Sequence, residues 1–378
     1  MTQPWTVGVE QEFLLVDPES RRPAACAAEV ARHAGDLLDV QRELTPYQIE
    51  VATPVCHTSA ELAEQVLLGR THLADAARAA SCRLLAAGVP PVGTAGPPPG
   101  SSDDPRYRLV EHSHRRLLGG QGVCGLHVHV GVPDRDTAVR VSNALRPWLP
   151  TLLALSANSP VEQAADTGYA SWRSIVWSRW PVGGPPPHLD SAEHYDHLVR
   201  TLLQTEVVLD VNMVYWDVRP SSHVPTVEVR VADIPQTAHE VVVIAELVRA
   251  FTRTAGTAAE SPERVDDVLL RAAYWRAARD GVDGLGADPR TGRLLPARDL
   301  AAELVAYCAD ALRDAGSLEA VEDHLEWLRA NGSGAARQRR AFGASPDARD
   351  LVDLLLAETV ADGRARLPWT THRTGGVR

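Results

Sequence analysis

Three segments of the chain carry pairs of charged or metal-binding side chains, two residues apart, within otherwise apolar runs. The pairs are Glu10 and Glu12 in TVGVEQEFLLV, His127 and His129 in CGLHVHVGV, and Glu228 and Arg230 in TVEVRVAD. Residues i and i+2 of a β-strand point to the same face of a sheet. The spacing therefore predicts three strands that each have one apolar face and one face of functional groups.

Carboxylates and imidazoles in this arrangement favour the wall of a metal-binding pocket over a solvated sheet face. Two ionised carboxylates on one side of a strand, such as Glu10 and Glu12, repel each other unless a cation lies between them. Glutamate oxygens are suitable ligands for hard cations. The pattern leaves open a solvated edge strand for these two residues and a simple cross-strand ion pair for Glu228 and Arg230.

Four further charged residues fit such a pocket. Glu43 and Glu50 flank a short turn in ELTPYQIE, although each alone is typical of a surface carboxylate. Arg219 stands at a predicted strand end in YWDVRPS, and Arg173 lies in the aromatic segment YASWRS. Guanidinium groups suit phosphate or carboxylate oxygens geometrically. Together these residues indicate a site that neutralises phosphate charge, where Mg²⁺ bridges phosphates and arginine stabilises the transferring group.

The chain contains no lysine, since all 38 basic residues are arginine. This absence excludes a Walker A lysine, a kinase-type lysine and a Schiff-base lysine. A second interpretation of His127 and His129 is a zinc hydrolase of the amidohydrolase type, in which an HxH motif also occurs. The absence of lysine weakens this interpretation. In those enzymes the motif lies near the N-terminus, and later histidine and often lysine ligands are required.

Composition limits the class of protein further. With 378 residues and 44% hydrophobic content the chain can bury a large core. Its net charge of −11 argues against a nucleic-acid or anionic-membrane partner. There is no apolar run of roughly 20 residues for a membrane span and no signal pattern, so we expect a cytoplasmic location. Five cysteines without a CxxC motif predict reduced thiols rather than disulfides.

The periodicity predicts one α+β domain over residues 1–361 and a flexible tail over 362–378. Expected strands are 5–16, 48–53, 124–132, and a hairpin of 211–219 with 226–233. Expected helices are 59–87 with Ser59 as N-cap, one containing Val139, Leu145 and Leu149, 192–209, and most of 236–360. Proline- and glycine-rich stretches at 88–107 and 166–190 predict loops, whose parts at 90–105 and 181–188 are candidate lids or interface segments.

The segments that carry this chemistry also carry a family resemblance. They are GVEQEF, ELTPYQIEVATPVC, CGLHVHVGV, ALSANSP, YASWRS…SRWP and WDVRPSSHVPTVEVRVAD. In this order they resemble the type 2 glutamate–cysteine ligase-like carboxylate–amine ligases, over about residues 5 to 360. The resemblance implies a glutamine synthetase-like catalytic fold, in which helices pack on the outer side of a curved, mainly antiparallel active-site sheet.

The implied reaction is an ATP-dependent ligation. ATP phosphorylates a carboxylate, in the archetype the γ-carboxyl of glutamate, and an amine, by default that of cysteine, displaces the phosphate to form an amide. ADP and phosphate are released, and the product belongs to the synthesis of a glutathione-like thiol. The implied partners are these small molecules and a second copy of the chain in a homodimer.

The resemblance also implies roles for the site residues. The implied metal ligands are Glu10, Glu12, Glu43, Glu50, His127 and Glu228, for two or three Mg²⁺ ions, with Mn²⁺ as an alternative. Glu10, His127 and Glu228 would share one ion, and the remaining ligands would hold metal nearer the acceptor. Arg219 and Arg230 would contact phosphoryl oxygens or the substrate carboxylate. Arg173 would add an anion-binding group on a mobile loop, and His129 would lie beside the metals, near ATP.

Two alternatives remain open at this stage. The same ligase chemistry can act on another amine or carboxylate, because no residue pattern defines the acceptor pocket. A catalytically silent metal- or nucleotide-binding protein is the second alternative, since a fold and its ligands do not by themselves establish turnover.

Overall fold

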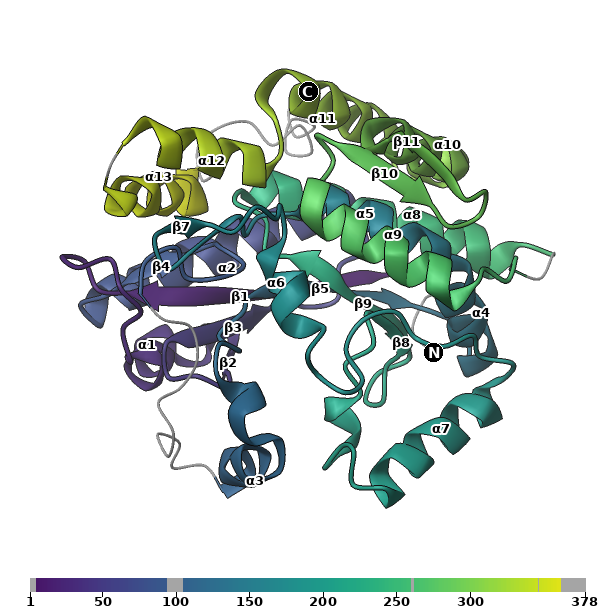
Figure 1. Ribbon diagram of the computed structural model, residues 1–378, viewed down its shortest axis with the longest axis horizontal. Helices are drawn as coiled ribbons and strands as arrows, with labels where there is room; N and C mark the ends of the chain where they lie inside the picture. Colours follow the sequence, from purple (N-terminus) through teal and green to yellow (C-terminus); the bar gives the residue numbers. More distant parts are fainter. Residues whose placement is uncertain (1–4, 94–104, 260–261, 346, 362–378) are drawn as a thin grey trace, which may run out of the picture.

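A seven-stranded antiparallel sheet crosses the centre of the molecule (Figure 1). The computed structural model describes residues 5–93, 105–259, 262–345 and 347–361. The strand order is β2-β3-β1-β5-β9-β8, and β4 pairs with β1. The strands are β1 Val7–Val16, β2 Asp39–Arg42, β3 Gln48–Ala52, β4 Arg83–Leu85, β5 Gly125–Gly131, β8 Val218–Pro220 and β9 Thr226–Asp233. The predicted α+β class and single domain are confirmed.

One group of helices covers one face of this sheet, and other helices lie on its far side (Figure 1). The helices are α1 Ala27–Ala34, α2 Ser59–Ala79, α3 Pro105–His114, α4 Arg135–Leu145, α5 Leu149–Ser156, α6 Trp172–Trp177, α7 Ala192–Gln204, α8 Ala238–Thr257, α9 Asp267–Asp280, α10 Ala297–Asp314, α11 Leu318–Asn331, α12 Gly334–Ala344 and α13 Ala348–Ala361. In Figure 1, α5, α8, α9, α10 and α11 lie together above the sheet, whereas α3 and α7 lie below it. None of the described helices is long and apolar enough to cross a bilayer.

The alternating valines of the central strands explain why the helices take this face. Val9 of β1, Val128 of β5 and Val229 of β9 are at most 2% exposed and belong to one apolar cluster with α8 residues such as Val241. Burying such a side chain contributes roughly 1.5–3 kcal/mol. Because the side-chain period of a strand is two, this burial forces the alternate residues onto the opposite face.

The start of α2 differs from the prediction by one residue. Thr58, not Ser59, is the N-cap: its hydroxyl accepts a hydrogen bond from the Glu61 N–H at 3.1 Å, and the Glu61 carboxylate accepts from the Thr58 N–H. This reciprocal capping box selects Thr58, because the glutamate stands three residues after it. The Ser59 hydroxyl instead lies 2.8 Å from that of Ser317.

Several other predicted bounds were also wrong. Elements that were not predicted include β4, within a predicted helix, α6, within a predicted loop, and α3, which begins at the end of another. A hairpin of β10 (Leu285–Asp288) with β11 (Arg293–Pro296) also lies within the region predicted to be helical. A second short pair joins β6 (Val161–Glu162) to β7 (Ala165–Asp166). Residues 211–213 form a 3₁₀ turn instead of a strand, and α7 ends at Gln204. The five cysteines are free, as predicted. The predicted tail at 362–378 and most of the loop at 90–105 lie outside the described residues.

A fully buried arginine on α2 ties the sheet to its surroundings. The Arg70 guanidinium donates to the Gln11 side chain at 2.9 Å and to the carbonyls of Pro235 and Gln236 at 2.9 and 2.7 Å. Gln11 lies between the two glutamates of β1 but on the helix-covered face. Arg70 thus joins α2 to β1 and to the segment after β9. Both β1 and β9 carry residues of the charged face.

We expect Arg70→Leu to lower the free energy of unfolding by about 3 kcal/mol, because the substitution leaves buried carbonyls without donors. Urea denaturation measures this change. Arg78→Ala is the matched control on the same helix, since its side chain is 57% exposed and pairs with Asp75 at the surface; its effect should stay within about 0.5 kcal/mol. Equal losses in the two variants would contradict the role given to Arg70.

Candidate active site

The sheet face opposite the helices collects the charged side chains of five strands. Antiparallel register places Glu12 opposite Glu50 and Glu10 opposite His127. It also places Glu228 between His129 on one side and Arg219 on the other. The predicted metal ligands and arginines on β1, β3, β5, β8 and β9 are therefore brought together on one face.

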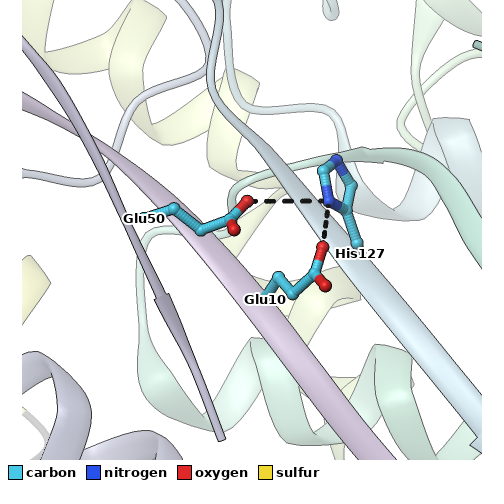
Figure 2. Close-up of side chains that lie close together, drawn as sticks. All are labelled: Glu10, Glu50 and His127. Carbon is cyan, nitrogen blue, oxygen red and sulfur yellow. Dashed lines mark hydrogen bonds and ion pairs between the residues drawn. The ribbon is translucent and has the colours of Figure 1, made fainter. Parts of the chain in front are cut away.

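The first group joins Glu10, Glu50 and His127. Figure 2 shows both carboxyl groups reaching the same imidazole nitrogen from different strands. The distances from His127 Nδ1 are 2.8 Å to Glu10 Oε2 and 3.8 Å to Glu50 Oε2. The other ring nitrogen lies 3.4 Å from Glu12 Oε1. His127 is 2% exposed, so its contacts are with these carboxylates rather than with solvent.

The second group joins Glu10, His129 and Glu228, whose donor atoms lie within 4.8 Å of one another. His129 Nε2 is 3.2 Å from Glu10 Oε1 but makes no hydrogen bond within the described structure. The resemblance implied His127 as the partner of Glu10 and Glu228. The structure instead groups His129 with these two carboxylates, and it groups His127 with Glu10 and with Glu50 of β3.

The third group joins Glu12, Glu43 and Glu50, again with donor atoms within 4.8 Å. Glu43 stands in the segment between β2 and β3, which returns it beside Glu50. Glu12 Oε2 accepts a hydrogen bond of 2.5 Å from the backbone N–H of Gly125. This contact was not predicted from the sequence. Gly125, the first residue of the strand that carries the HxH motif, could have indicated it, because a glycine in a strand often marks a close approach of other groups.

The crowding of these carboxyl groups shifts their pKa values in opposite directions. Burial and the charge of Glu12 raise the pKa of Glu43 to about 8. Burial and the neighbouring carboxylates likewise raise the pKa of Glu50 well above its usual range. Burial would also raise the pKa of Glu10, but the hydrogen bond with His127 and the nearby imidazoles of His127 and His129 hold it below its usual range. The divergence arises because Glu43 and Glu50 are surrounded mainly by like charges, whereas Glu10 lies beside the two imidazoles.

Two arginines neutralise Glu228. The Arg219 guanidinium donates to both oxygens of Glu228, at 2.8 and 3.2 Å, and Arg230 forms an ion pair with the same carboxylate. Although burial opposes ionisation, these charges hold the pKa of Glu228 below its usual range. The Nε of Arg230 is buried and has no hydrogen-bond partner among the described residues. The arrangement therefore retains an unused donor beside the carboxylates.

Arg173 is held more tightly than the expected mobile loop implied. It lies in helix α6 and is 2% exposed. Its guanidinium crosses the charged face above Gly125, where a Cβ atom would come within 2.3 Å of it. It donates to the carbonyls of Arg230 and Val231 at 3.3 and 3.5 Å, and it lies over the Trp177 ring at 5.7 Å. Arg173 and Glu12 both lie against Gly125, so the structure places Arg173 beside the predicted ligands. The predicted loop around it was wrong, because residues 172–177 are helical.

The donor set fits divalent cations. The three groups contain only carboxylate and imidazole ligands, and Glu10 and Glu50 each belong to two of them. Oxygen-rich sets of this kind suit Mg²⁺ or Mn²⁺ rather than a thiol-seeking metal. The crowded carboxyl groups of Glu43 and Glu50 favour proton binding when no cation is present, and a shared divalent cation can replace those protons. The proposed ligands are thus compatible with two or three adjacent hard cations.

The raised pKa of Glu43 leads to a test by pH. A carboxyl group whose pKa is higher in the folded than in the unfolded protein stabilises the fold at low pH, and this contribution is lost as the pH rises through about 8. Without divalent ions we expect Tm to fall between about pH 6 and pH 8.5. Because a cation replaces the proton, Mg²⁺ should raise Tm more at the higher pH. Thermal denaturation at both pH values, with and without Mg²⁺, measures this. A Mg²⁺ shift independent of pH, or undiminished in Glu43→Gln, would contradict it.

Proteins of similar sequence cover almost the whole chain. A Saccharopolyspora erythraea protein named "Putative glutamate--cysteine ligase 2-1" is 49% identical over 364 residues, which cover 96% of this chain and 97% of that protein. A Mycolicibacterium vanbaalenii protein, with the corresponding name ending in 2-2, is also 49% identical, over 96% of this chain and its own full length.

Solved structures share the fold at low sequence identity. Glutamate–cysteine ligase from Francisella tularensis, solved in complex with AMP, aligns with a TM-score of 0.69 at 13% identity and covers 96% of this chain and 89% of that one. A bifunctional glutathione synthetase from Pasteurella multocida aligns with a TM-score of 0.68 at 16% identity, over 95% of this chain and 52% of that chain. These likenesses confirm the glutamine synthetase-like ligase fold.

The profile of one sequence family matches nearly the whole chain, over residues 6–364. The family is described as glutamate–cysteine ligase family 2, or GCS2. Together with the relatives at 49% identity, this match shows that the chain belongs to glutamate–cysteine ligase family 2.

Proposed function

We propose that this protein is an ATP-dependent carboxylate–amine ligase that joins the γ-carboxyl of glutamate to the amine of cysteine. The reaction would pass through γ-glutamyl phosphate and release ADP and phosphate. One observation carries the proposal: three overlapping groups of metal-ligating side chains lie on one buried sheet face, with arginines beside them. The homodimer and the cytoplasmic location belong to the same proposal.

The charge arrangement supports a reaction between two anions. A carboxylate approaching ATP brings several negative charges together, and the barrier falls when positive groups are already in place. The three groups would hold Mg²⁺, whose positive charge would offset this repulsion. Arg219 and Arg230 offer guanidiniums at the Glu228 end, and Arg173 offers one at the Glu12 end. These residues would bind and orient phosphoryl and carboxylate oxygens.

The nucleotide would enter from the Glu10 and His129 end of the face. There a cavity of about 220 Å³ is lined by residues 6–10, 52, 53 and 55, by His129 and Gly131, and by residues 224–226. Most of these contribute apolar side chains or backbone, which suits a base and ribose better than a phosphate chain. A nucleotide placed here would direct its phosphates towards Glu10, and the acceptor would occupy the opposite end, beside Glu12 and Glu43.

The first test is a turnover assay with Mg²⁺, ATP and glutamate, with and without cysteine and a panel of other amines. Phosphate release and product mass are followed together. We expect cysteine-dependent ADP formation and the mass of γ-glutamylcysteine. Glu228→Gln should lower kcat by about 100-fold or more, because it removes a charged ligand where the phosphates meet.

Glu240→Gln is the matched control, since Glu240 is also a buried glutamate paired with an arginine, Arg337, at 2.8 Å. Glu240 belongs to the first turn of α8, outside the charged face. The kcat of the folded Glu240→Gln protein should therefore stay within about threefold of wild type. Turnover with another amine only would retain the mechanism and change the substrate. No turnover with any amine, although nucleotide binds, would favour a catalytically silent binding protein.

A further inference from the structure

Three of the segments quoted for the family resemblance converge on one carboxylate that has no part in the metal groups. Asp233, the last residue of β9, is 0% exposed. Its Oδ2 accepts hydrogen bonds from the Asn158 N–H at 2.8 Å and the Ser159 hydroxyl at 2.7 Å. Its Oδ1 accepts from the Ser171 hydroxyl at 2.7 Å. Asp233 thus joins the end of β9 to the segment after α5 and to the start of α6.

A bulge places Asp233 on the charged face. Strict alternation from Glu228 would put residue 233 among the apolar side chains, because the separation is odd. In the ladder with β5, however, Val229 pairs with Val128 and Ala232 with Leu126, so β9 contains one extra residue. The face changes at such a bulge. Asp233 consequently pairs with Gly125, directly below the guanidinium of Arg173.

The hydrogen bonds of Asp233 lead to Arg173 by two routes. Ser171 is the N-cap of α6, where its hydroxyl also accepts from the Ser174 N–H at 3.2 Å. The Ser159 hydroxyl accepts from the backbone N–H of Arg173 at 3.0 Å. In addition, the Arg173 guanidinium lies 4.0 Å from Asp233 Oδ1. Asp233 therefore positions the backbone of Arg173 through serine hydroxyls, and it also lies close to the guanidinium of Arg173.

The guanidinium held in this way has an unused donor. Arg173 Nε is buried and has no hydrogen-bond partner among the residues that the structure describes. The remaining nitrogens make only long contacts, of 3.3 and 3.5 Å, to the carbonyls at the bulge. An arginine with so few close partners is costly to bury without a ligand. A substrate oxygen at the Glu12 end of the face would supply the missing acceptor.

We propose that Asp233 is a positioning residue for the ligase reaction: it holds α6 so that the Arg173 guanidinium lies over Gly125, facing anionic oxygens of the substrate. This inference rests on the proposed function for the identity of the substrate. The placement of Arg173 by Asp233 rests on the contacts alone. A carboxylate suits this position because it accepts from the two hydroxyls and the backbone N–H and also balances the buried guanidinium.

A double-mutant cycle tests the proposal. Asp233→Asn keeps the size of the side chain but removes its charge, and Arg173→Ala removes the positioned group. If Asp233 acts through Arg173, each change should lower kcat about 10- to 100-fold, and the double variant should match Arg173→Ala within about threefold. KM for ATP should stay within about threefold in all three variants, because the nucleotide enters at the far end of the face.

Asp288→Asn is the matched control for the loss of a buried carboxylate. Asp288 is 3% exposed and accepts from the Thr291 hydroxyl at 2.9 Å and from Arg290 Nε at 2.8 Å, within the β10–β11 hairpin. Its effect on kcat should be small and should multiply with that of Arg173→Ala. Multiplying effects of Asp233→Asn and Arg173→Ala would instead overturn the proposal.

A crystal structure of the Asp233→Asn protein supplies a readout that does not depend on turnover. We expect the Arg173 guanidinium to leave its place over Gly125. An unmoved guanidinium would overturn the positioning role even if kcat falls. If Asp233→Asn does not fold, Gly125→Ala gives the same test, because the added Cβ displaces the guanidinium directly; a wild-type kcat in that variant would overturn the proposal. If wild type turns over no amine, the proposed function fails, and the crystal structure alone decides the role of Asp233.

Discussion

The crowding of carboxylates on one face of the sheet is the constraint on which the rest of the structure depends. Glu10, Glu12, Glu43 and Glu50 approach one another closely enough to share ligand groups, at a position where solvent screens their repulsion poorly. The protein holds them there through the rigid pairing of β1, β3 and β5 and through the apolar packing on the other face. The free energy of burying the valines of these strands opposes the tendency of the like charges to separate.

Much of this arrangement is predictable from the sequence, because the period of two in three short segments assigns the residues of the central strands to a face wherever the ladder is regular. The alternation of Glu10 and Glu12 with Val9 and Gln11 is enough to predict both a charged and an apolar side. The order of the strands is not predictable in this way. Register and neighbours depend on contacts between distant segments, and Arg70, which ties α2 to the segment after β9, has no local signal of burial.

Local alternation could not place two residues, Asp233 and Arg173, and the physical reasons differ. A pattern of alternation holds only while the ladder is regular, and the bulge in β9 shifts the face of every later residue. Asp233 stands within a quoted motif, yet its parity assigns it to the wrong side. Arg173 was expected in a loop for a different reason: a helix of six residues is too short for periodicity to reveal, and its N-cap is tied to a carboxylate 62 residues further along the chain.

The charged face is neutralised differently at its two ends, and this difference links the cations to the anionic substrates. Towards Glu228 the neutralising groups are arginines, whereas at the other end of the face burial and the neighbouring carboxylates raise the pKa values of Glu43 and Glu50 and so favour their protonated forms. Cations bound at the glutamates would displace protons from these groups and would also compete with the arginines for Glu228. Guanidiniums released from Glu228 would then be available for phosphate or carboxylate oxygens, while a substrate that draws them away would leave Glu228 to the cations. Linkage requires that the effect of the cations on substrate binding equal the effect of the substrate on cation binding.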